Sequence, residues 1–159
     1  MRNTVIVMLA VLILAGCGGK TPTAQTGPAP SVTTSAPQHT AGELATAMGL
    51  GKVTVWTAAT DENHLLGRPG GYTSAATIVD KRIPCTDPAT DCGATIEVYP
   101  TEAEALARSQ YIQSILSGGG LLGTEYHYFA GGALLRVTGE LTPDQAKAYA
   151  AKFEVAAQR

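Results

Sequence analysis

The stretch Ala-Thr-Ile-Glu-Val-Tyr-Pro-Thr-Glu-Ala-Glu, residues 94–104, decides the fold because one element ends and the next begins within it. Apolar residues occupy alternate positions of its first part, as in a half-buried strand. They share one face: Ala94, Ile96 and Val98. Pro100 ends the strand, and Thr101 with Glu104 has the spacing of a helix capping box. The stretch therefore predicts a strand followed by a helix that runs to about residue 116.

Similar signals on both sides predict the remaining elements. Capping boxes also begin helices at Thr40 and Thr142, and Gly131-Gly132 has the composition of a tight hairpin turn. We expect helices at 40–48, at 101–116 and from 142 onward, and strands at 52–57, 72–83, 94–99, 123–129 and 133–138. This order, α-β-β-β-α-β-β-α, predicts an α+β fold, an antiparallel sheet of about five strands with the helices packed on one face. The other face is expected to be partly hydrated.

The first residues have the pattern of an export signal. Arg2 precedes an apolar run over residues 5–15, which is too short to cross a bilayer as a helix of roughly 20 residues. Leu14-Ala15-Gly16-Cys17 ends this run and resembles the lipobox of bacterial lipoproteins. The resemblance implies that a diacylglycerol is attached to the sulfur of Cys17 and that the signal peptide, residues 1–16, is removed. The alternative is an ordinary secretory signal with a coincidental cysteine.

The segment after the signal has the composition of a disordered tether. It is rich in Pro, Thr and Ser and has no aromatic residue, so it cannot bury enough apolar surface to offset the entropy of ordering it. We therefore expect the lipidated cysteine and a tether over residues 17–39 and a single α+β domain over residues 40–159. Such a tether reaches on the order of 25–30 Å.

Cysteine use and charge narrow the class of protein. Cys85 and Cys92 are expected to form a disulfide outside the cytoplasm. The alternatives are two free thiols or a metal pair completed by Asp87 and Asp91. The net charge is −2 and the basic residues are scattered, so no nucleic-acid partner is expected. The Gly118–Gly120 run lacks the Lys-Ser/Thr of a phosphate-binding loop, and no cofactor is expected.

Three pieces of the chain carry a further resemblance. They are residues 60–74, which contain Leu-Leu-Gly-Arg-Pro-Gly, residues 96–111, and Leu-Leu-Arg-Val at 134–137 followed by Leu-Thr-Pro at 141–143. Together they are similar to an uncharacterised, mostly actinobacterial family of small secreted proteins and lipoproteins. Members often have Pro where this chain has Glu62, a departure that affects the rigidity of the loop. The resemblance supports the fold and a location outside the cytoplasm, and it implies no activity.

The connection between the first two strands is the candidate binding loop. Its candidate residues are Asp61, Asn63, His64, Arg68 and Tyr72. His64 next to carboxylates suggests a general base or a weak cation site, whereas a capped turn with a solvated histidine explains the same residues without chemistry. Arg68 either clamps an anionic ligand through its planar guanidinium or pairs with a carboxylate such as Asp80 and holds the loop on the sheet.

A second histidine, His127, is expected in the strand at 123–129, with Tyr126 and Tyr128 on the opposite face. An aromatic strand of this kind suggests a binding surface, because aromatic residues are enriched in the cores of interfaces. Equally, one face belongs to the core and the other is exposed.

The sequence therefore predicts a non-enzymatic, lipid-anchored binding or interaction module on the extracytoplasmic face of the cell membrane. Besides the membrane, its partner would be an envelope protein or a cell-wall component. The alternative is a small envelope hydrolase that uses His64 or His127 with a neighbouring carboxylate. A solute-binding protein ranks third, because a single domain lacks the two lobes that usually close around a solute.

Overall fold

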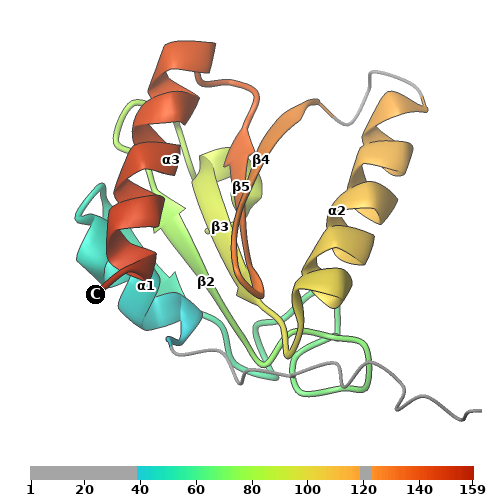
Figure 1. The fold of residues 1–159 in the computed structure, drawn as a ribbon. Helices are drawn as coiled ribbons and strands as arrows, with labels where there is room; N and C mark the ends of the chain where they lie inside the picture. Colours follow the sequence, from blue (N-terminus) through green and yellow to red (C-terminus); the bar gives the residue numbers. More distant parts are fainter. Residues whose placement is uncertain (1–38, 119–122) are drawn as a thin grey trace, which may run out of the picture. The chain divides into compact units, whose positions relative to one another are not determined.

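A computed structural model describes residues 39–118 and 123–159, which form an α+β fold with the predicted order of elements (Figure 1). The helices are α1 (Ala41–Met48), α2 (Glu102–Ser117) and α3 (Pro143–Ala157). The strands are β1 (Lys52–Val55), β2 (Ser74–Val79), β3 (Gly93–Val98), β4 (Glu125–Ala130) and β5 (Ala133–Thr138), and a short 3-10 turn, η1 (Thr90–Cys92), precedes β3. The lipobox at 14–17, the signal peptide at 1–16 and the tether up to residue 38 lie outside the described residues. Among the described helices, none is long and apolar enough to cross a membrane.

All five strands form one antiparallel sheet in the order β1-β2-β3-β5-β4, which confirms the predicted fold class. β3 lies at the centre, where Ile96 pairs with Ala76 of β2 and Leu135 of β5. β4 and β5 form a hairpin whose turn contains Gly131 with a φ of 54°, at the predicted position. β3 precedes α2 in the chain and β4 follows it, and in the sheet these two strands lie on either side of β5.

One face of the sheet carries the main apolar core. The predicted strand face of Ala94, Ile96 and Val98 is fully buried there, against α1 and α3. Tyr149 and Phe153 of α3 belong to the same cluster. The alternation of β3 therefore predicted correctly which side faces the core.

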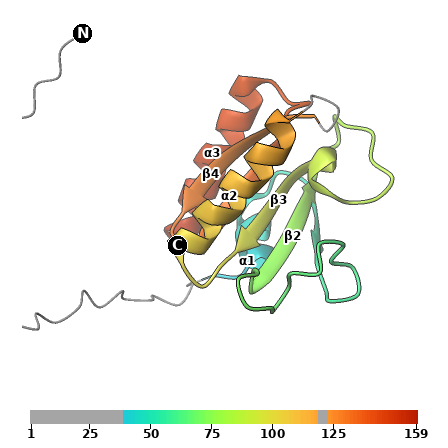
Figure 2. The same ribbon diagram turned by 90° about the vertical axis from the view of Figure 1, so that its right-hand side faces the viewer.

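The second helix lies on the opposite face, so the prediction that the helices pack on one face is wrong for α2 (Figures 1 and 2). Ala105 of α2 packs with Leu134, whereas the adjacent Leu135 belongs to the core under α1 and α3. Every residue of β3 and β5 is buried as a result. The alternating strand pattern predicted a partly hydrated far face, but Glu97 and Arg136 on that face form an ion pair with each other beneath α2.

Most helices and strands begin and end close to the predicted residues. α1 and α3 begin with reciprocal capping boxes. At α2 the Thr101 hydroxyl accepts a bond from the Glu104 amide, but the Glu104 carboxylate binds that hydroxyl instead of the Thr101 amide. β2 stops at Val79 rather than near residue 83, because Asp80 accepts bonds from the backbone and side chain of Arg82 and begins a turn.

The loop after β2 is closed by a covalent link. Cys85 and Cys92 form a disulfide, which confirms the predicted pair over free thiols or a metal pair. The bond joins the loop to the start of β3, and a disulfide is consistent with an oxidising compartment.

Candidate functional site

A network of charged and polar side chains lies between the sheet and α2. Because strand residues alternate between faces, Glu97 of β3, Arg136 of β5 and His127 of β4 all point toward α2. α2 contributes Arg108 and Ser109, three and four positions after the packed Ala105. Within residues 39–118 and 123–159, every buried side-chain nitrogen or oxygen has a hydrogen-bond partner.

Glu97 is the centre of this network, and its side chain is completely buried. Its carboxylate accepts bonds from Arg136 Nη1 at 2.8 Å, from Arg108 Nε at 3.2 Å and from the Tyr99 hydroxyl at 2.8 Å. A buried carboxylate needs such compensation, because an uncompensated charge in the interior is strongly destabilising.

Glu125 pairs with the other side of Arg136. Nε and Nη2 of Arg136 donate to the two carboxylate oxygens of Glu125 at 2.8 Å each, a bidentate geometry. Burial alone raises the pKa of Glu125, but bonds from His127 and Arg136 outweigh it and lower the pKa to about 2. Burial lowers the pKa of Arg136, but both carboxylates outweigh that and raise it. Both groups are therefore fixed in their charged forms.

His127 joins Glu125 to α2. The Ser109 hydroxyl lies 2.7 Å from His127 Nδ1, and Glu125 Oε2 lies 3.0 Å from Nε2. This is a serine–histidine–carboxylate chain, but hydrolases place the nucleophile on Nε2 and the carboxylate on Nδ1. Ser109 is 7% exposed, in the middle of a helix, and the His127 side chain is 6% exposed. These three hydrogen-bonded side chains therefore fasten α2 to the edge strand β4 and do not present a nucleophile.

Asp61 organises the candidate binding loop from inside. Its carboxylate accepts bonds from the amides of Asn63 at 3.1 Å and of Leu65 and Leu66 at 2.7 Å each, and from the Tyr72 hydroxyl. Burial raises the pKa of Asp61, but these hydrogen bonds outweigh it and the net pKa is lowered. Tyr72 is completely buried and its ring packs edge-on against Trp56 and Tyr99. Asp61 and Tyr72 thus hold the loop.

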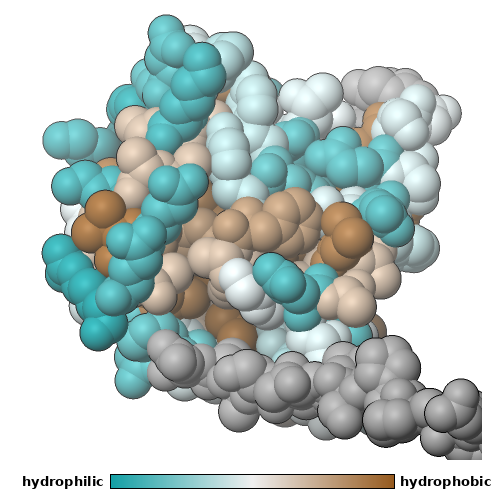
Figure 3. All heavy atoms as spheres, viewed as in Figure 1, coloured by the Kyte–Doolittle hydropathy of each residue, from teal (hydrophilic) through white to brown (hydrophobic). Residues whose placement is uncertain are grey.

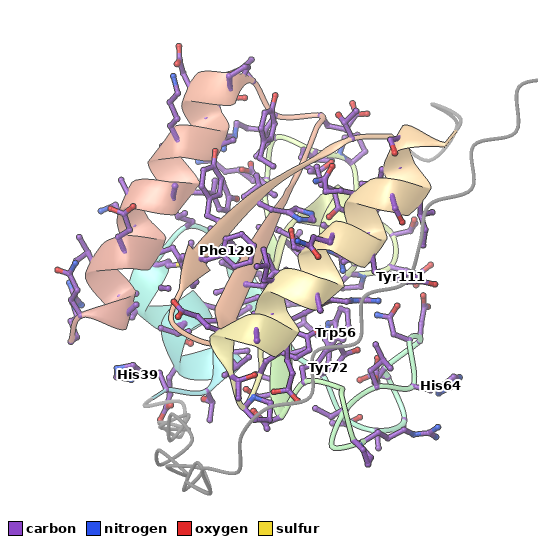
Figure 4. The ribbon with its side chains drawn as sticks, turned by 45° about the vertical axis from the view of Figure 1, so that its right-hand side comes forward. His39, Trp56, His64, Tyr72, Tyr111 and Phe129 are labelled. Atoms are coloured by element: carbon purple, nitrogen blue, oxygen red, sulfur yellow. A yellow bond between two sulfur atoms is a disulfide. The ribbon has the colours of Figure 1, made fainter. Side chains whose placement is uncertain are left out.

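His64 and Arg68 lie on the outer side of the loop. His64 is exposed with a φ of 54°, and Figure 4 shows it directed away from Trp56 and Tyr72. Arg68 is also exposed. The predicted structural pairing of Arg68 with Asp80 is wrong, because Asp80 binds Arg82 and the Tyr149 hydroxyl instead. Of the five candidate loop residues, Asn63 is the one that lines the two cavities described next, both of which lie within the described part of the chain.

A groove of about 740 Å³ lies between α2 and this loop. We call it the apolar groove. Its apolar side chains are those of Leu65, Ala107, Tyr111, Ile112, Ile115 and Leu116, its polar side chains are those of Asn63, Glu104, Arg108, Glu125 and Arg136, and Gly70 completes the lining. Tyr111 is 59% exposed and Ile115 is 42% exposed, although α2 covers the sheet with its other side. The loop therefore borders a concave site whose base is the charged network.

A smaller cavity of about 270 Å³ lies on the other side of Asn63. We call it the polar pocket. It is lined by Trp56, Thr60, Glu62, Asn63, Pro88, Ala89, Thr90, Asp91 and Arg136. The disulfide-bonded loop supplies one wall and the candidate binding loop the other. Asn63 and Arg136 line both cavities, so the two adjoin.

Another apolar surface lies across α2 from the groove. Figure 3 shows apolar residues gathered between α3 and α2, and Phe129 of the edge strand β4 is 40% exposed. Figure 4 places Phe129 and Tyr111 on opposite sides of α2. The apolar groove is the stronger candidate because ligand sites are concave, mostly apolar and supplied with a few fixed polar groups.

The sequence pointed to the loop but missed most of the site. Glu97, Arg108, Glu125 and Arg136 were not singled out. A usable signal existed, since Glu97 and Arg136 each interrupt an otherwise apolar and small strand with a charge of opposite sign.

Neither a metal centre nor a relative adds to this geometry. Within residues 39–118 and 123–159, no group of three or more His, Cys, Asp or Glu residues is placed to hold a metal ion. Comparison with protein-family models, curated proteins and solved structures found no match.

Proposed function

We propose that the protein is a lipid-anchored binding module on the extracytoplasmic face of the cell membrane, and that it binds its ligand in the apolar groove. The observation that carries the binding part is the exposure of Tyr111 and Ile115 within a concave site. Ala105 of α2 is buried against the sheet, whereas Tyr111 and Ile115 keep large apolar side chains exposed where they border the loop. The anchoring part comes from the lipobox pattern at Cys17.

The base of the groove supports binding because it is held rigidly. Arg108, Glu125 and Arg136 line the groove, and each is fixed by ion pairs within the network. Preformed polar groups reduce the entropy that a ligand loses on binding. The loop wall is fixed in the same way, through Asp61.

A small hydrolase is the second candidate. The hydrogen-bonded chain of Ser109, His127 and Glu125 favours it. It ranks below the binding module because Ser109 and His127 are not among the residues that line the two cavities. Covalent labelling of Ser109 by a fluorophosphonate in the folded protein would reverse this order, and its absence would remove the hydrolase.

The anchor is tested by Cys17→Ser in cells that make the full chain. We expect wild type to take up a radiolabelled fatty acid and to sediment with membranes, because two acyl chains with about 0.8 kcal/mol for each buried methylene anchor a protein stably. The variant should take up no label, and it should be released or keep its leader. Equal labelling and equal sedimentation of both proteins would contradict the anchor.

The groove is tested by Ile115→Glu, with Leu106→Glu as the matched control. Both residues are on α2 and similarly exposed, 42% and 48%, but only Ile115 lines the groove. We expect a molecule that co-purifies with wild type from its native membranes to be depleted about tenfold in Ile115→Glu, since a charge in an apolar site opposes binding. Mass spectrometry of the denatured proteins measures this.

Leu106→Glu should retain that molecule at the wild-type level. The groove proposal fails if all three proteins carry the same molecules in the same amounts. Equal melting temperatures of the two variants ensure that loss of the molecule reports binding and not unfolding.

A further inference from the structure

The two cavities differ in chemistry and share a boundary. The apolar groove presents aliphatic and aromatic side chains, whereas the polar pocket is lined mainly by hydroxyl, amide and charged groups. Asn63 and Arg136 belong to both linings. One ligand that spans this boundary would need an apolar part on one side and a polar part on the other.

The charges of the polar pocket restrict the polar part. Glu62 and Asp91 line it as exposed carboxylates, and Arg136 lines it from the buried side. An anionic group would meet two carboxylates, and its natural partner, Arg136, is already neutralised by Glu97 and Glu125. A cationic group would meet two carboxylates that are exposed to solvent, so water and salt screen their attraction for it, and it would approach the Arg136 guanidinium. Neither sign of net charge is matched by this pocket.

A hydroxyl group matches both kinds of lining. It donates to carboxylates and to the Asn63 carbonyl, and it accepts from amide and guanidinium N–H groups. Three Arg136 nitrogens donate to carboxylates, and the two terminal ones each carry a second N–H. Thr60 and Thr90 add hydroxyls, and Trp56 adds an aromatic side chain. This combination fits a neutral head group rich in hydroxyls.

We propose that the apolar groove and the polar pocket form one site for a neutral amphiphile, with its hydrocarbon part against Tyr111 and Ile115 and a hydroxyl-rich head between Trp56 and Asn63. This inference rests on the proposed function and names the class of ligand. It explains why the groove adjoins a polar pocket, and why the charged network between them is internally neutralised.

The experiment uses residues 17–159 with Cys17→Ser, which include every described residue and need no detergent. The probe is decyl maltoside below its critical micelle concentration. Trp56 is the chain's one tryptophan, and it lines the polar pocket, so its fluorescence reports on the head group. Titration calorimetry gives the dissociation constant independently.

We expect saturable binding of decyl maltoside with a change in Trp56 fluorescence. Maltose, decanoate and decyltrimethylammonium should each bind at least about tenfold more weakly. Ile115→Glu should weaken decyl maltoside binding by about tenfold, and Leu106→Glu should leave it within about twofold.

Three outcomes would overturn the inference. They are binding of decanoate or the ammonium amphiphile as tight as that of decyl maltoside, a signal that appears only with micelles, and equal losses in Ile115→Glu and Leu106→Glu. If the probe fails while a native molecule still depends on Ile115, the ligand class is wrong and the binding function stands. If neither depends on Ile115, the binding function fails as well.

Discussion

Replacing Arg136 by alanine is expected to lower the free energy of unfolding by about 3–5 kcal/mol, measured by urea denaturation. Arg136 is 9% exposed and is the ion-pair partner of both Glu97 and Glu125. Its loss leaves Glu97 with only Arg108 as a cation and leaves the Glu125 carboxylate with only His127 as a partner. The cost of removing one member of a buried ion pair comes mainly from the charge left behind.

Lys147→Ala is the matched control, because it also removes a cation from an ion pair. Lys147 and Asp144 are 74% and 95% exposed at the side chain, so this change should alter stability by no more than about 0.5 kcal/mol. If Arg136→Ala costs as little as Lys147→Ala, the network does not hold α2 to the sheet.

The pH dependence of the stability difference between wild type and Arg136→Ala provides a second measurement. The pKa of Glu125 in the folded protein is about 2, below its ordinary value of 4.5. Its contribution is therefore complete above pH 4.5 and is lost as the pH falls through 2. The difference in unfolding free energy between wild type and Arg136→Ala should therefore narrow as the pH falls from 4.5 to about 2. A difference that stays constant or widens on acidification would contradict the ion pair.

The fold was predictable because its signals are local. Alternation over 94–99 identified the core face of β3, and capping residues marked the starts of all three helices. The side of the sheet on which α2 packs is not given by any local signal. The alternating strand pattern predicted a partly hydrated far face, whereas Glu97 and Arg136 pair with each other on that face beneath α2. They are 39 residues apart, and a single sequence does not show that they pair.

In the candidate site, too, the local interactions were predictable and the long-range ones were not. Asp61 was predicted to cap its own turn and does so, through amides within five residues. Its bond to Tyr72 crosses eleven positions and was not predicted. Arg68 was paired with Asp80 on charge alone, whereas Arg82, two residues from Asp80, reaches it first. Sequence reasoning therefore found the loop and its local bonds, and the tertiary structure decided which residues face the groove.

Replacing Asp61 by alanine is expected to cost about 3 kcal/mol of unfolding free energy, because a buried carboxylate that accepts four hydrogen bonds disappears and its donors lose their partner. Asp61→Asn keeps one acceptor oxygen and should cost about half as much. Hydrogen exchange at the Leu65 and Leu66 amides should accelerate in both variants. Glu62→Ala, at the adjacent exposed carboxylate, should change stability by no more than about 0.5 kcal/mol.

Acid titration separates the charge of Asp61 from its role as an acceptor. The net pKa of Asp61 is lowered from its ordinary value of 3.8, so its stabilisation is present above that pH and is lost as the pH falls through the folded value. Asp61→Asn cannot titrate, so its deficit relative to wild type should be largest near neutral pH and shrink below 3.8. Because Asn63, Leu65 and Gly70 line the groove from this loop, the same variant should also weaken binding there. A deficit independent of pH, with unchanged exchange at Leu65 and Leu66, would mean that Asp61 does not hold the wall of the groove.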